Sequence, residues 1–145
     1  MKYNLDDLHW QQFEILSFYC LQKDVSVSIE FLEGGNDKGR DIVYEGTSEK
    51  FNPSWNGKWI FQIKHKSHLE TNSSRLSSAL VSDFKTELIK ICLQTCVDFD
   101  NYILVTNLNI TSSLHDSLHN AFKTFCKEHN ILNKNFKKLR VLWIN

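Results

Sequence analysis

The sequence predicts an α/β fold: a three-layer α/β/α sandwich whose mixed sheet combines an antiparallel three-strand meander with the parallel crossovers that follow it. Two observations lead to this prediction. Three strand-like segments follow one another between residues 25 and 64 through short connections, which favours antiparallel neighbours. Beyond residue 75, helical and strand-like segments alternate to the end of the chain, as they do in parallel crossovers.

The size and composition of the chain indicate one soluble domain. Its 145 residues, 41% of them hydrophobic, can form a single core, so we expect residues 1–145 to be one domain. No stretch approaches the ~18 apolar residues that span a bilayer, and the N-terminus lacks the apolar segment of a secretory signal. The four cysteines show no C-x-x-C spacing. We therefore expect a cytoplasmic protein with no membrane partner.

The first half of the chain is predicted to hold one helix and the meander. Asp6 or Asp7 can cap a helix that runs to about Gln22. Apolar residues surround most of this helix, so we expect it to be covered on several sides. The three strands are predicted at residues 25–32, 40–45 and 58–64, with a glycine-rich turn at residues 34–37.

The second half is predicted to alternate helices with strands. Apolar residues at spacings of three and four indicate helices, and one continuous apolar run indicates a strand that is covered on both faces. The predicted elements are, in order, a helix at 76–96, a strand at 102–106, a helix capped by Thr111 or Ser112 that runs to about His129, and a strand at 141–144.

Three polar residues of the meander form the strongest candidate site. Side chains alternate along a strand, so Gln62 and Lys64 project to the same face. If the preceding strand is the neighbour, Asp41 approaches both of them. Mg²⁺ prefers oxygen ligands, usually with only one or two carboxylates, and a nearby lysine can stabilise charge on a phosphate or help to deprotonate the attacking water. The trio therefore suits metal-dependent cleavage of phosphodiester bonds.

Glu14 is a fourth candidate, in the first predicted helix. Helical geometry places it beside Trp10, Phe18 and Leu21, so that it is an acid inside an apolar stripe. Acids rarely lie there without a partner. A metal-bound water is one candidate partner, and a position at the rim of the surface is the alternative.

The order of these motifs resembles a known nuclease family. The sequence has Phe13-Glu14 in the first helix, then Gly35-Asn36-Asp37-Lys38-Gly39-Arg40-Asp41, then Phe61-Gln62-Ile63-Lys64. This set is similar to the PD-(D/E)xK nuclease superfamily, and most similar to its Mrr-like restriction endonuclease branch, which often has Gln before x-Lys. Residues 102–107 and the helix after Thr111 also resemble that branch, so that the likeness spans nearly the whole chain.

The resemblance implies a restriction-endonuclease-like fold and a DNA endonuclease that depends on Mg²⁺, with Mn²⁺ as a substitute. It implies that Asp41 and Gln62 are metal ligands and that Lys64 is the catalytic lysine. Glu14 is implied to contact the metal through water, and the main-chain carbonyl of Ile63 to complete the site.

The resemblance also concerns the residues around this site. Asp37 is implied to be a turn or support residue. Arg40 departs from the small or aliphatic residue that we expect at its position. Apart from the resemblance, the candidate DNA contacts are Lys38, Arg40, His65 and Lys66. His65 and Lys66, beyond the third predicted strand, can contact phosphates or can simply be solvated residues of a loop.

The expected partners follow from the chemistry and from analogy. One such site cuts one strand, so we expect a homodimer or higher oligomer when the enzyme acts on duplex DNA. The chain ends one residue after its last predicted strand, from which we expect an effector domain of a larger protein. Mrr-like domains fused to sensor or ATPase modules suggest, by analogy alone, a role in bacterial restriction or anti-phage defence.

Three alternatives stay open. The fold can be a nuclease domain that has lost catalysis and serves DNA binding or oligomerisation. The trio can be a surface hairpin in which Lys64 merely pairs with Asp41. His115 and His119, four residues apart on a predicted helix, imitate a zinc motif, although two exposed histidines on an amphipathic helix are the simpler interpretation.

Overall fold

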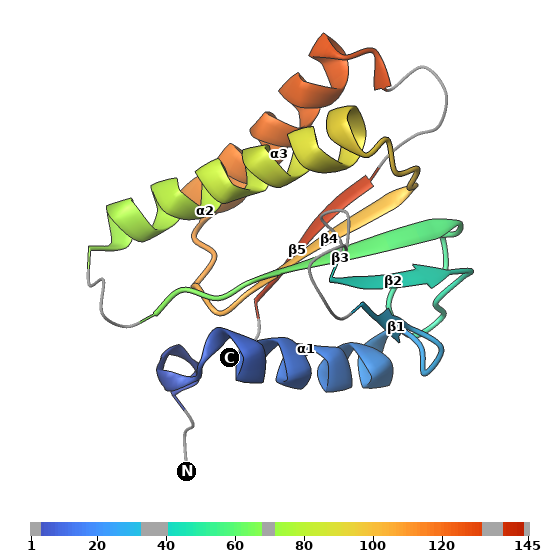
Figure 1. The fold of residues 1–145 in the computed structure, drawn as a ribbon, viewed down its shortest axis with the longest axis horizontal. Coiled ribbons are helices and arrows are strands. Elements are labelled where there is room, and N and C mark those ends of the chain that lie inside the picture. The colour runs from blue at the N-terminus through green and yellow to red at the C-terminus, as the bar shows by residue number, and fades with distance from the viewer. Residues whose placement is uncertain (1–3, 33–40, 68–71, 132–137, 144–145) are drawn as a thin grey trace.

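The computed structural model describes residues 4–32, 41–67, 72–131 and 138–143. These residues form a five-stranded mixed sheet between two helical layers, which is the predicted α/β/α arrangement (Figure 1). The strand order follows the chain, β1-β2-β3-β4-β5. The strands are β1 (Glu30–Phe31), β2 (Ile42–Glu45), β3 (Lys58–Lys64), β4 (Asn101–Thr106) and β5 (Lys138–Trp143). The first three are antiparallel, and β3, β4 and β5 are parallel.

Two helices cover one face of the sheet. They are α2 (Ser73–Ile89), which continues into the π-helical segment η2 (Lys90–Gln94), and α3 (Ser112–Glu128). Each connects neighbouring parallel strands and steps in the same direction, so the right-handed crossover rule places both on the same side. Figure 1 shows them together above the sheet. Phe84 and Leu118 from these helices pack with Leu104 of β4 in the core of this layer.

The opposite face is covered by α1 (Trp10–Asp24), which follows the short 3-10 helix η1 (Leu5–Asp7) (Figure 1). Phe13 and Leu21 of α1 belong to a second core cluster, together with Phe61 of β3 and Ile103 of β4. The sheet is therefore buried on both faces at β3 and β4, as the apolar run 102–106 predicts.

The first helix differs from its prediction in two respects. It begins at Trp10, because His9 accepts a hydrogen bond from the backbone of Gln11 and forms a capping box with Gln12. The expectation that it is covered on several sides is wrong. Only one of its faces meets the sheet, and Trp10, Ile15 and Tyr19 are 52%, 52% and 63% exposed.

The first strand is much shorter than the predicted 25–32. Among the described residues, the strand register with β2 contains only Glu30 and Phe31, and the preceding residues form turns. The Ser26 hydroxyl accepts a hydrogen bond from the backbone of Ser28, a local bond that competes with the strand ladder. Val25 and Ile29 are nevertheless buried, while Val27 is 76% exposed.

The other elements lie close to their predicted ranges. The strand 58–64 is confirmed, α3 is capped by Thr111 as predicted, and the last strand begins earlier than predicted, at Lys138. The predicted turn 34–37 lies outside the described residues. Among the residues that the structure describes, no helix is both long and apolar enough to cross a membrane.

Candidate active site

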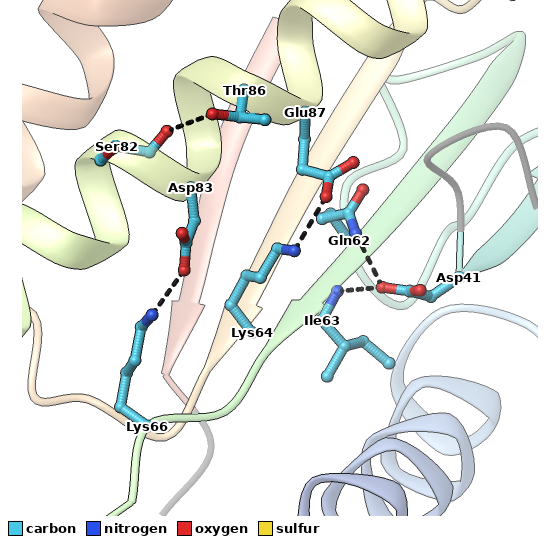
Figure 2. Close-up of polar contacts among 9 residues, drawn as sticks. All are labelled: Asp41, Gln62, Ile63, Lys64, Lys66, Ser82, Asp83, Thr86 and Glu87. Atoms are coloured by element: carbon cyan, nitrogen blue, oxygen red, sulfur yellow. Dashed lines mark hydrogen bonds and ion pairs between the residues drawn. The ribbon is translucent and has the colours of Figure 1, made fainter.

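The pairing of β2 with β3 brings the three predicted site residues to one face of the sheet. Ile42 lies opposite Phe61, so Asp41, just before β2, lies beside Gln62. Ile42 and Phe61 point into the core on the α1 side. Because side chains alternate along strands, Asp41, Gln62 and Lys64 all point toward the layer of α2, as Figure 2 shows for Gln62 and Lys64.

One carboxylate oxygen of Asp41 accepts two hydrogen bonds. Its Oδ2 accepts one from the backbone N–H of Ile63 at 2.7 Å and one from Nε2 of Gln62 at 3.0 Å (Figure 2). Asp41 is 8% exposed and Gln62 is 3% exposed. Two donors thus fix the orientation of a buried carboxylate at the beginning of β2.

Lys64 pairs with an acid that the sequence did not single out. Its Nζ lies 3.0 Å from Oε1 of Glu87 on α2 (Figure 2). Only 22% of the Lys64 side chain and 15% of the Glu87 side chain are exposed. A solvent-exposed hairpin in which Lys64 merely pairs with Asp41 does not describe this arrangement.

Glu87 could have been noticed by the same signal that marked Glu14. It lies on α2 beside Phe84, Leu88 and Ile91, all of which are fully buried. An acid next to such a stripe rarely lacks a partner. The sequence did not show that the crossover places this residue over the end of β3.

Three oxygen atoms on this face are buried and have no hydrogen-bond partner among the described residues. They are Oε1 of Gln62, Oε2 of Glu87 and the hydroxyl of Tyr102 on β4. A buried polar atom without a partner costs about 1–3 kcal/mol. Burial, followed by the charges of Glu87 and Asp41, raises the pKa of Tyr102 well above its usual value, so this hydroxyl keeps its proton.

Gln62 and Glu87, which carry two of these oxygens, line a cleft of about 290 Å³. Glu14 and Trp10 line it from α1, and Glu87 and Lys90 line it from the opposite helical layer. Between them lie the strand residues Asp41, Gln62, Ile63 and Lys64, with His65. The cleft therefore brings together Glu14, the predicted trio and the residue whose carbonyl was expected to complete the site.

The residues of the cleft fit a hard divalent cation. Its potential ligands are carboxylate and amide oxygens, which Mg²⁺ prefers, and no thiol lines it. Within the described part of the chain, no group of three or more His, Cys, Asp or Glu side chains is arranged to hold a metal ion by itself. An ion in this cleft would therefore depend on the Gln62 amide and on water or phosphate oxygens.

Two of the four candidate DNA contacts have partners inside the protein. Nε2 of His65 lies 2.9 Å from the carbonyl oxygen of Leu5. Nζ of Lys66 lies 2.5 Å from Oδ2 of Asp83 on α2 (Figure 2). Both side chains thus contribute to holding the helical layers against β3. The other two, Lys38 and Arg40, lie outside the described residues, as does Asp37.

His115 and His119 lie on α3, away from this cleft. Their ring centroids are 4.1 Å apart, and His115 also contacts the carboxylate of Asp116 at 3.3 Å. Partial burial, and next the neighbouring His115, lower the pKa of His119. The described residues provide no third ligand beside the pair, so the zinc motif is not completed there.

Comparison of the chain with protein-family models, with curated proteins and with solved structures found no match. The resemblance to the Mrr-like branch thus depends on the sequence motifs alone.

Proposed function

We propose that the chain is a Mg²⁺-dependent DNA endonuclease of the PD-(D/E)xK type. The observation that carries the proposal is the placement of Asp41, Gln62 and Lys64 on one face of the sheet, at a cleft toward which Glu14 also projects. These residues come from three segments of the chain, near positions 14, 41 and 62–64, and together they line one cleft, which supports the proposal of phosphodiester hydrolysis. A role in restriction or anti-phage defence stays an analogy.

The residues have separable tasks. Asp41, oriented by the Ile63 N–H, and the amide oxygen of Gln62 would hold the ion, and Glu14 would reach its outer shell through water. Bound Mg²⁺ would supply a Lewis acid and lower the pKa of a bound water. The ammonium of Lys64 would stabilise negative charge on the phosphate and orient the water that attacks phosphorus in line.

Plasmid cleavage in the presence of Mg²⁺ tests the proposal. We expect the wild type to cut, and Lys64→Ala and Asp41→Ala to lower the rate by roughly 10²-fold or more, as the loss of a transition-state contact does. Lys85→Ala is the matched control, because Lys85 is an exposed lysine on α2. Equal cleavage by all four proteins would contradict the proposal and point to a contaminating nuclease.

The alternative is a nuclease fold without catalysis that serves DNA binding or oligomerisation. One observation favours it: three large side chains of α1, Trp10, Ile15 and Tyr19, are more than half exposed. Calorimetry separates the two functions. If the domain has lost catalysis, the wild type should bind Mg²⁺ or Mn²⁺ no better than the Asp41→Ala variant does.

A further inference from the structure

We infer that Glu87 is a direct ligand of the divalent cation, which lies between its carboxylate and the amide oxygen of Gln62. This inference deepens the proposed function and rests on it for the identity of the site as a metal centre. It adds a second acidic ligand, contributed by a helix, to the one carboxylate that the strands provide.

The first step concerns the amide of Gln62, which lies between two carboxylates. Its Nε2 donates to Asp41, and its Oε1 is buried without a partner. Figure 2 shows this end of the amide pointing toward Glu87, whose Oε2 is also buried without a partner. Turning the amide over would only set its oxygen against Asp41. One amide cannot satisfy both acids, and the protonated Tyr102 hydroxyl donates to neither free oxygen in the structure. A positively charged group between the two free oxygens resolves the conflict.

The second step compares Glu87 with the acid one helical turn before it. Asp83 and Glu87 both lie on α2 and pair with lysines two residues apart, Lys66 and Lys64 (Figure 2). The Asp83 side chain is 42% exposed, so water can reach its carboxylate, whereas that of Glu87 is only 15% exposed. Lys64 therefore neutralises one oxygen of Glu87 and leaves a second, buried oxygen directed at the site.

The third step is the charge of the cleft. Its lining includes three carboxylates, Glu14, Asp41 and Glu87, and two ammonium groups, Lys64 and Lys90. The formal balance is minus three plus two, or minus one, when His65 is neutral. A bridging water could donate hydrogen bonds to the two free oxygens but would leave this charge. A divalent cation would bind both oxygens and would change the formal charge of the cleft from minus one to plus one.

Titration with Mn²⁺, followed by calorimetry and by the electron paramagnetic resonance of the free ion, tests the inference without DNA. We expect Glu87→Gln to weaken Mn²⁺ binding by about 10-fold or more, the lower end of the losses seen on weakening a metal site. Asp83→Asn is the matched control and should bind Mn²⁺ within about 2-fold of the wild type. Unlike Glu87, Asp83 has no carboxylate oxygen that is buried without a hydrogen-bond partner.

Lys64→Met separates a metal ligand from a residue that only positions Lys64. Removing the lysine releases the other oxygen of Glu87, so we expect this variant to bind Mn²⁺ at least as tightly as the wild type while it loses cleavage. If Glu87 only positioned Lys64, Glu87→Gln would lose cleavage and keep Mn²⁺ affinity. Should Glu87→Gln fail to fold by circular dichroism, Glu87→Asp keeps the charge and should also weaken binding.

The outcomes distinguish this inference from the proposed function. Unchanged Mn²⁺ affinity in Glu87→Gln, with Mg²⁺-dependent cleavage by the wild type, overturns the inference alone. Mn²⁺ binding that depends on Glu87, in a protein that cuts no nucleic acid, overturns the nuclease proposal alone. A wild type that binds no divalent ion overturns both.

Discussion

Asp41 shows how one side chain can serve both the fold and the site. It lies outside the paired residues of β2, yet its carboxylate accepts the N–H of Ile63 and the amide of Gln62. These bonds fix the geometry at the end of β3 before any ligand binds. A preformed carboxylate loses little freedom on binding a cation, which favours affinity.

At the residue scale we predict that Asp41→Ala and Asp41→Asn differ in stability but not in metal binding. Alanine leaves the buried N–H of Ile63 without an acceptor, so it should lower the free energy of unfolding by about 1–3 kcal/mol. Asparagine keeps an acceptor oxygen and should cost less, yet it removes the charge that a cation needs. Urea unfolding and Mn²⁺ titration measure the two effects; equal destabilisation by both substitutions would show that these hydrogen bonds contribute little.

At the scale of elements, α3 is the helix whose local signals are clearest. Thr111 caps it by accepting a hydrogen bond from the N–H of Leu114 at 3.2 Å, and its buried residues Leu114, Leu118, Phe122 and Cys126 follow helical spacing. By contrast, α2 ends in a π-helical segment that begins at Lys90, a residue of the cleft. Such segments occur frequently at functional sites.

We predict that Thr111→Ala destabilises the protein by about 1 kcal/mol, because the first turn of α3 loses its cap. Ser113→Ala, an exposed substitution in the same turn, is the control and should have little effect. Urea unfolding of the two variants beside the wild type measures the difference. Equal unfolding midpoints would mean that water replaces the cap.

A second prediction for α3 concerns pH. Burial, followed by the proximity of His115, lowers the pKa of His119 in the folded chain below its ordinary value of 6.5. The unfolded chain then binds the proton more readily than the folded chain does. The contribution of His119 to stability is therefore constant above pH 6.5 and falls as the pH drops from 6.5 toward the folded-state pKa. In NMR titration His119 should titrate below 6.5, and His115→Gln should move it upward. A titration that His115→Gln leaves unchanged would contradict the assigned cause.

At the scale of the whole molecule, the cleft lies between the two helical layers, at the carboxyl end of β3. Parallel strands commonly present functional groups at this end. Glu14 reaches the cleft from below the sheet and Glu87 from above it, as the positions of α1 and α2 in Figure 1 indicate. Relative movement of either layer therefore changes the site.

Each chain has one such cleft among its described residues, so we predict stepwise cutting of duplex DNA. Supercoiled plasmid should first become nicked, and linear product should appear later, with a steeper dependence on protein concentration. Gel analysis over a range of concentrations, beside light scattering of the free protein, measures this. Linear product formed directly by a monomer would refute the expected dimer.

The placement of the candidate site was partly predictable. Alternation along the strand at 58–64 put Gln62 and Lys64 on one face, and the meander put Asp41 beside them, as the structure has it. The helical stripe around Glu14 indicated an unusual acid, which the structure places in the same cleft. The inward contacts of His65 and Lys66 were not predictable, because their partners Leu5 and Asp83 come from distant elements.

The sequence by itself determined which segments form β3, β4 and α3 and which of their faces are buried, because those properties follow from the period of apolar residues along a few turns. Only the tertiary structure decided that β1 is two residues long, that one face of α1 stays exposed, and that Glu87 lies against Lys64. These properties depend on which element packs over which strand end. That choice is set by the handedness of the crossovers and by packing between distant segments, which no local pattern records.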